Sequence, residues 1–151
     1  MIYADSSFVV AQRVLRDNFH DTALEYYEAH QDEVWLWSPW QRVEVFNTIR
    51  QLTQHPDKSM RLSTGEARGL IVRLQDDVRL GYFQHLEADW RDVLRTANDL
   101  SIEFGFRLPC CSADLLHVAY AKELVAGSFV SFDEDQLQLA KAAGLNAVRP
   151  D

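Results

Sequence analysis

Residues 1–10 read MIYADSSFVV. The apolar run 2–4 (IYA) is typical of a short buried strand, and Ser6 or Ser7 can begin a helix that continues through VVAQRVL. Asp5 lies between the two. Burying a carboxylate beside apolar surface is costly unless something pairs it. Asp5 is therefore either the N-cap of this helix or one part of a charged site that residues further along the chain complete.

Short apolar segments and helical segments alternate along the rest of the chain. The further strands expected are residues 33–37 (EVWLW), 128–132 (SFVSF) and 146–149 (NAVR), while 80–85 (LGYFQH) fits a strand or a loop. The expected helices cover residues 21–30 with Asp21 as N-cap, 39–53 with Ser38 as N-cap, 64–78 with Ser63 and Glu66 as a capping box, 89–104, 113–124 with Ser112 as N-cap, and 133–144. This alternation indicates βαβ units.

The predicted fold is thus α/β, a three-layer α/β/α sandwich with a central parallel sheet, formed by a single domain of residues 1–151. Right-handed crossovers bring the ends of such strands to one edge of the sheet, and ligands bind outside the carboxyl ends. Asp5 follows the first strand, and Asp133 follows the FVSF run. We expect both at that edge.

The composition fits an ordinary globular protein: 47% of the 151 residues are apolar and 25% are charged. No basic leader and no apolar run of roughly 18 residues is visible, so we expect a cytoplasmic protein that does not enter the membrane. The net charge of −8 argues against a broad basic surface that grips nucleic acid. Adjacent Cys110 and Cys111 suit neither a disulfide nor a zinc site, and we expect small, partly buried residues without a chemical role.

Two further acids occur in apolar surroundings. Glu44 lies in WQRVEVFNTI, and Asp114 lies in CCSADLLHVAYA. Each has a structural alternative, because Glu44 could pair with an arginine (Arg13, Arg42 or Arg50) and Asp114 could complement the dipole of its helix. Asp133 could likewise cap the helix that begins at Glu134. Four such acids in one parallel α/β chain nevertheless favour a shared site.

The ordered set YADSS, VEVFNTI, SADLLHVAYA and FVSFDEDQLQLA resembles a PIN domain, and within that family the VapC-type ribonuclease toxins of toxin–antitoxin pairs. The resemblance covers nearly the whole chain. It implies that Asp5, Glu44, Asp114 and Asp133 hold Mg²⁺ or Mn²⁺ and are the catalytic residues. Ser131 stands where the family usually has threonine, and Ser7 matches a small hydroxyl position that orients a ligand or water. Asp135 is a further carboxylate near this set.

The resemblance implies a metal-dependent endoribonuclease that leaves 5′-phosphate and 3′-hydroxyl ends, restrained by a small antitoxin and forming a homodimer. Carboxylate oxygens suit these hard cations, and a bound cation relieves the repulsion among gathered carboxylates. Four arginines are possible phosphate contacts: Arg13, Arg16, Arg42 and Arg50. His117, three residues after Asp114, either approaches the pocket or is an ordinary helix residue.

Other functions find less support in the sequence. The alternative within the family is a catalytically silent PIN-like module that binds RNA or protein. No GxGxxG, Walker-type or GxSxG motif is present, and the five histidines lack zinc-type spacing. DSSFV does not match the DxDxT motif of a haloacid dehalogenase-type phosphatase, and the acids and lysine of a receiver domain cannot be placed. Trp35, Trp37, Trp40, Tyr26 and Tyr27 are expected mostly in the core, with a partner surface as the alternative.

Overall fold

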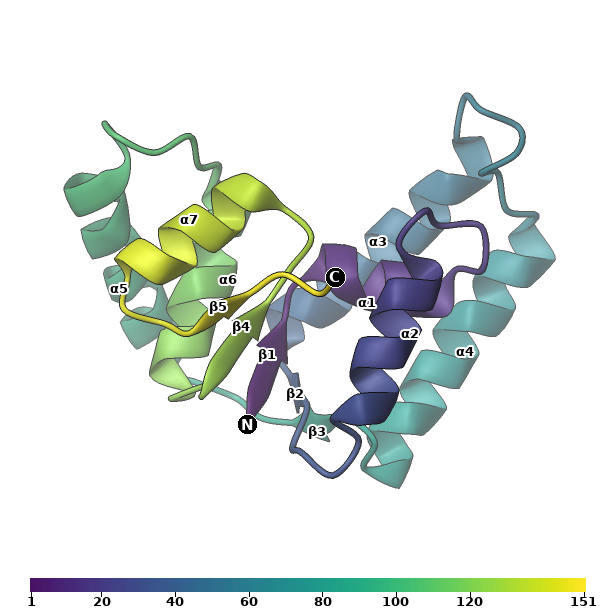
Figure 1. Cartoon of the computed structure of the whole chain (residues 1–151), viewed down its shortest axis with the longest axis horizontal. Coiled ribbons are helices and arrows are strands. Elements are labelled where there is room, and N and C mark those ends of the chain that lie inside the picture. Colours follow the sequence, from purple (N-terminus) through teal and green to yellow (C-terminus); the bar gives the residue numbers. More distant parts are fainter.

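Five short parallel strands meet in the middle of the molecule (Figure 1). The computed structural model describes all of residues 1–151. β1 (Ile2–Ala4), β4 (Ser128–Val130) and β5 (Ala147–Val148) pair in the order β1-β4-β5, and β2 (Leu36–Trp37) pairs with β3 (Gln84–His85). A parallel bridge between Ile2 and Trp35 joins the two groups. β1 therefore lies centrally, with β2 on one side and β4 on the other.

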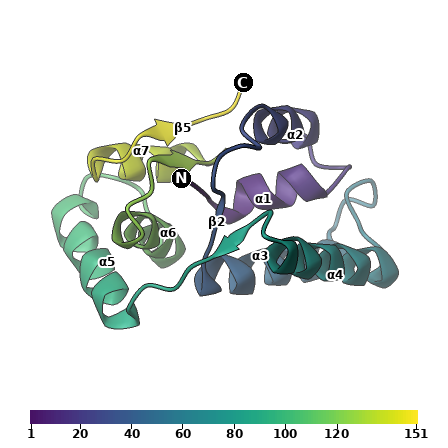
Figure 2. The same ribbon diagram turned by 90° about the horizontal axis from the view of Figure 1, so that it is seen from below.

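Helices cover both faces of this sheet (Figure 2). One face carries α1 (Ser6–Arg13), α2 (His20–Ala29), α3 (Pro39–Gln51) with the 3₁₀ turn η1 (Leu52–Gln54), and α4 (Thr64–Leu80). The other face carries α5 (Trp90–Phe104), α6 (Ser112–Glu123) and α7 (Glu134–Ala142). This arrangement confirms the predicted three-layer α/β/α architecture with a parallel sheet.

The strands divide the core because successive side chains of a strand point to opposite faces. In β1, Ile2 and Ala4 pack with the helices α1 to α4, while Tyr3 packs with α5 to α7. In β4, Val130 belongs to the first of these cores and Phe129 to the second. The short central strands are therefore buried on both sides, which explains their continuous apolar sequence.

Most of the expected aromatic core is confirmed. Trp35 and Trp37 are each 2% exposed and pack in the core beneath α1 to α4. Tyr26 and Tyr27 pack against the same core and are partly buried. Trp40 is also partly buried, against the core on the other face. None of the helices combines the length and the apolar character that crossing a bilayer requires.

Of the four helix starts for which the sequence named a residue outside the acidic set as N-cap, two agree with the structure and two differ. Ser38 and Ser63 cap α3 and α4, each within a capping box. The prediction of Asp21 as N-cap was wrong: the Asp17 carboxylate accepts the N–H of Phe19 at 2.9 Å, which closes a turn, and the helix begins at His20. α6 begins one residue earlier than expected, with Cys111 rather than Ser112 as N-cap.

Three strands are shorter than predicted. The second strand does not extend back to residue 33. β1 begins at Ile2, and Ile2 already pairs with Trp35, so no residue of β1 lies beside residue 33. β4 ends at Val130, and the hydroxyl of the next residue, Ser131, donates a hydrogen bond to Asp5 just after β1. The last strand keeps only residues 147–148, and part of the ambiguous segment 80–85 forms β3.

Candidate active site

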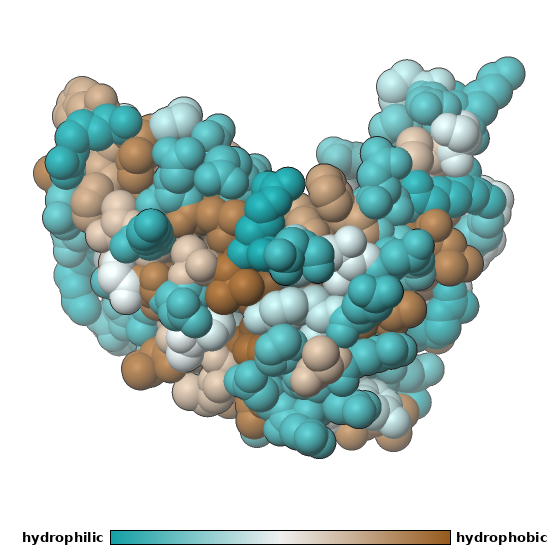
Figure 3. Space-filling model, in the orientation of Figure 1, coloured by the Kyte–Doolittle hydropathy of each residue, from teal (hydrophilic) through white to brown (hydrophobic).

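A pocket of about 620 Å³ opens at the carboxyl ends of β1 and β4. The space-filling view is hollowed between the arm formed by α5 to α7 and the arm formed by α3, η1 and α4 (Figure 3). All four acids predicted from the sequence line this pocket, together with residues that follow β1 or begin α6 and α7. Its polar lining includes Asp5, Ser6, Ser7, Glu44, Asp114, Asp133 and Gln136. Segments far apart in the sequence thus meet here, as the topology of the sheet predicts.

Asp5 is the most buried of the four acids, at 2% exposure. Its carboxylate accepts the N–H of Phe8 at 2.9 Å and the hydroxyls of Ser7 and Ser131 at 2.8 Å each. Burial raises the pKa of Asp5, and the charge of His117 and these hydrogen bonds offset only part of that effect. Both interpretations of Asp5 hold together: it caps α1, and it lines the pocket.

Glu44 is held by a buried histidine and not by an arginine. Ser6 Oγ and His117 Nε2 both donate to Glu44 Oε2, and no ion pair joins Glu44 to Arg13, Arg42 or Arg50. Burial alone would raise the pKa of Glu44, but the hydrogen bond and charge of His117, with the hydrogen bond of Ser6, outweigh it and lower the pKa. The Glu44 side chain is therefore kept ionised at the edge of the pocket.

His117 itself is 1% exposed. Its Nδ1 lies 3.0 Å from the Tyr3 hydroxyl, which in turn lies 3.3 Å from Ser38 Oγ. This buried chain of hydrogen bonds runs from the N-cap of α3 through β1 to Glu44. The sequence predicted that His117 either approaches the pocket or is an ordinary helix residue. In the structure it contacts Glu44, which lines the pocket.

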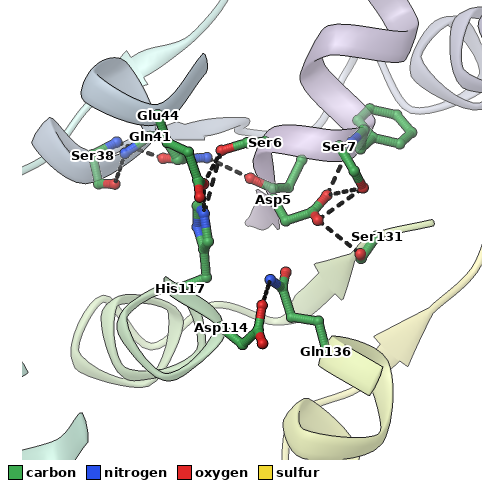
Figure 4. Close-up of polar contacts among 12 residues, drawn as sticks. Asp5, Ser6, Ser7, Ser38, Gln41, Glu44, Asp114, His117, Ser131 and Gln136 are labelled. Atoms are coloured by element: carbon green, nitrogen blue, oxygen red, sulfur yellow. Dashed lines mark hydrogen bonds and ion pairs between the residues drawn. The ribbon is translucent and has the colours of Figure 1, made fainter. Parts of the chain in front are cut away.

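Asp114 and Asp133 also make local hydrogen bonds. Asp114 accepts the N–H of Cys111 at 2.6 Å and the Nε2 amide of Gln136 at 2.9 Å. Asp133 caps α7, accepting the N–H groups of Asp135 and Gln136 at 2.9 and 3.1 Å. Figure 4 shows Asp5, Glu44, Asp114 and Gln136 approaching one another from different segments. Asp114 and Asp133 therefore make the hydrogen bonds at helix starts that the sequence allowed as an alternative, and both also line the pocket.

Of the supporting residues, Ser7 lines the pocket, Ser131 lies outside the lining but contacts Asp5, and Asp135 contacts Asp133 but none of the other three predicted acids. Ser131 Oγ donates to Asp5 and accepts the N–H of Asp133 at 2.8 Å, so it ties the ends of β1 and β4 together. Ser7 Oγ accepts the N–H of Phe132 at 3.3 Å. Asp135 is exposed and lies outside the pocket lining.

The arginines predicted as phosphate contacts lie away from the pocket lining. Arg13 pairs with Asp77 at 3.0 Å, and Arg16 pairs with Glu66 at 2.8 Å. The other two, Arg42 and Arg50, are exposed on α3. Cys111 is exposed and lines the pocket, which differs from the partly buried position expected for it.

The donor atoms of the pocket are of the kind that a hard cation prefers, but they are not close enough together to bind one. Carboxylate, hydroxyl and amide oxygens are the ligands that Mg²⁺ and Mn²⁺ prefer. No three Asp, Glu, His or Cys side chains lie close enough together to hold a metal ion. Each of the four carboxylates instead accepts hydrogen bonds from N–H or O–H donors of the protein. One amide oxygen in the lining, that of Gln136, has no hydrogen-bond partner.

Sequence reasoning missed two residues of this site, Ser6 and Gln136. Ser6 was considered only as a helix start. Gln136 precedes Leu139 and Ala140 by three and four positions, so it lies on the buried face of α7. A glutamine on an apolar helix face, three residues after a predicted site aspartate, is the signal that could have identified it.

These features together define an α/β protein of PIN-like fold with an acidic pocket at the carboxyl edge of its sheet. Two solved structures share the fold over almost the whole chain. VapC20 from Mycobacterium tuberculosis, described as a sarcin–ricin loop cleaving toxin, is 22% identical with a TM-score of 0.66, covering 99% of this chain and 100% of its own. FitAcB from Neisseria gonorrhoeae is 17% identical with a TM-score of 0.65, covering 97% and 96%. No protein-family model and no curated sequence matches the chain.

Proposed function

We propose that this protein is a divalent-metal-dependent endoribonuclease of the VapC type. The observation that carries the proposal is the convergence of Asp5, Glu44, Asp114 and Asp133 on one pocket. It is supported by the fold shared with VapC20, whose described target, the sarcin–ricin loop, is an RNA. The same resemblance suggests a toxin that a small antitoxin restrains.

In this proposal Asp5, Glu44, Asp114 and Asp133 would hold Mg²⁺ or Mn²⁺. Such a cation, when bound, lowers the pKa of water and stabilises negative charge on the phosphate. Holding it would require these side chains to lie closer together than they do here. The raised pKa of Asp5 is consistent with this role, because a buried carboxylate gains most from a nearby positive charge.

The proposed role of Glu44 depends on its hydrogen bonds with Ser6 and His117. Its Oε2 accepts hydrogen bonds from Ser6 and His117, while its Oε1 has no protein partner. The lowered pKa keeps this side chain ionised, so Oε1 is free to accept a hydrogen bond or to contact a cation. His117 and Ser6 thus act as positioning residues for Glu44.

The proposed partners follow from charge and shape. An RNA phosphate cannot approach four carboxylates without a cation between them. The net charge of −8 suits an antitoxin with a basic tail that reaches into the pocket, and pairing of two copies of the chain would lengthen the groove for RNA. The resemblance to VapC-type toxins also implies a homodimer in the cytoplasm, which we propose for this chain.

Incubation with RNA tests the activity directly. We expect the purified protein to cleave RNA when Mg²⁺ or Mn²⁺ is present and to lose this activity in EDTA. The cleaved ends should carry 5′-phosphates, which a ligation assay detects. Cleavage that persists undiminished in EDTA would contradict the metal dependence and the role of the carboxylates.

One observation favours a second function, a binding module without activity. Every one of the four carboxylates already has protein donors, and no three of them converge as metal ligands. A silent module would bind RNA or its protein partner equally well with and without Mn²⁺. The RNA incubation with and without EDTA separates the two functions, because a silent module leaves the RNA intact in both.

A further inference from the structure

Gln136 combines a nearly complete burial with an unpaired polar atom. The residue is 4% exposed and lies in the pocket lining, in the first turn of α7. Its Nε2 donates to Asp114 at 2.9 Å, but its Oε1 is buried and accepts no hydrogen bond. Leaving a buried amide oxygen without a hydrogen-bond partner costs free energy, because the group has lost its water and gained nothing in return. Such an atom calls for a ligand that the pocket can admit.

The orientation of the amide group is fixed by its neighbour. An ionised carboxylate only accepts hydrogen bonds, so the NH₂ end of Gln136 must face Asp114 and the oxygen must face the other way. In Figure 4 that oxygen points from α7 toward the side of the pocket where Asp5 lies. An amide oxygen has no proton to give, so its partner must be a cation or a hydrogen-bond donor.

We propose that Gln136 Oε1 is a ligand for the divalent cation in this pocket, and that its Nε2 orients Asp114 toward the same cation. This inference rests on the proposed function. Neutral amide oxygens are ordinary ligands for hard cations and add no charge to a site that already holds four carboxylates. One side chain would thereby join α6 and α7 at the cation and satisfy its own buried oxygen.

The substitution Gln136→Met tests the inference by changing the hardness of the ligand. Methionine is similar in length and shape, but its thioether sulfur is a poor ligand for Mn²⁺ and a good one for soft Cd²⁺. We expect Mn²⁺ to bind about tenfold more weakly and Cd²⁺ to bind with unchanged or higher affinity. Calorimetric titration of each metal measures both affinities. Every protein in the series carries Cys110→Ser and Cys111→Ser, because thiolates bind Cd²⁺ and Cys111 lines the pocket.

Gln138→Met is the matched control, since Gln138 lies two residues further along α7 and is exposed. It should leave both affinities unchanged, and thermal unfolding in EDTA verifies that all variants fold. If Gln136→Met weakens both metals by the same factor, residue 136 only positions Asp114 and the inference is wrong. Unchanged binding of both metals overturns it as well. Failure of the protein with Gln136 intact to bind Mn²⁺ would instead overturn the proposed function itself.

Discussion

Asp5→Asn is expected to lower the rate of RNA cleavage by about 10³-fold, since loss of the cation's charge stabilisation is worth several kcal/mol. The fold should persist, because asparagine is as good an N-cap as aspartate and can still accept the N–H of Phe8. Its amide matches the carboxylate in shape. Cleavage of one RNA at several enzyme concentrations, with Mn²⁺ in excess, gives the ratio of rates.

The same substitution should make the protein more stable at neutral pH when EDTA is present. Because burial raises the pKa of Asp5 in the folded state, its ionisation opposes folding: the stabilising effect of the protonated form is complete below the unfolded pKa of about 3.9 and is lost as pH rises through the folded pKa. The melting temperatures of the two proteins should therefore converge near pH 3 to 4, roughly at that unfolded value, and separate by pH 7.

Asp99→Asn provides the control for both measurements, because Asp99 is exposed on α5. It should change neither cleavage nor the dependence of melting temperature on pH. An Asp5→Asn protein that cleaves RNA at the rate of the unsubstituted protein would remove Asp5 from the reaction. A melting temperature that falls at pH 7 would show that the buried carboxylate stabilises the fold.

His117→Leu is expected to destabilise the protein by about 3 kcal/mol. It leaves Glu44 without its buried partner and leaves the Tyr3 hydroxyl, which lies 3.0 Å from His117 Nδ1, with Ser38 alone. Urea unfolding in EDTA measures the free energy. Cleavage should fall too, because Glu44 loses the group that holds it.

The effect of pH distinguishes this role from simple packing. The lowered pKa of Glu44 means that its interaction with His117 stabilises the fold above the unfolded pKa of about 4.3, and that this contribution is lost as pH falls through the folded pKa. The difference between the unsubstituted protein and His117→Leu should therefore shrink below about pH 4. His85→Leu, at an exposed position of β3, is the control. A difference independent of pH would mean that His117 acts only by filling space.

The sequence predicted the layers of the fold because binary pattern and topology determine them together. Short apolar strands alternating with capped helices leave few arrangements other than a covered parallel sheet. Asp5 and Asp133 could be placed at one edge because each directly follows a strand. Glu44 and Asp114 were singled out by their apolar surroundings, but only the family resemblance assigned them to the metal site, since nothing local says which face of a helix meets a distant sheet edge.

What the sequence could not give is the pairing within the site. The structural alternative for Glu44 was an ion pair with Arg13, Arg42 or Arg50, but Arg13 pairs with Asp77, and a histidine 73 positions away is the partner of Glu44. Gln136 was overlooked because its neighbours in the segment DEDQLQLA are mostly polar. The Glu44–His117 contact joins α3 to α6 and the Asp114–Gln136 contact joins α6 to α7, so both depend on helix packing, which is a long-range property of the chain.

Crystals grown with Mn²⁺ would show whether the four acids share a metal site, because anomalous scattering locates the metal without reference to activity. We expect an Mn²⁺ peak inside the pocket, in contact with oxygens of Asp5 and of at least one acid from another segment: Glu44, Asp114 or Asp133. A pocket that stays without such a peak at millimolar Mn²⁺, a concentration on the order of that which fills even weak hard-cation sites, would contradict the shared metal site. So would a peak found only elsewhere on the protein.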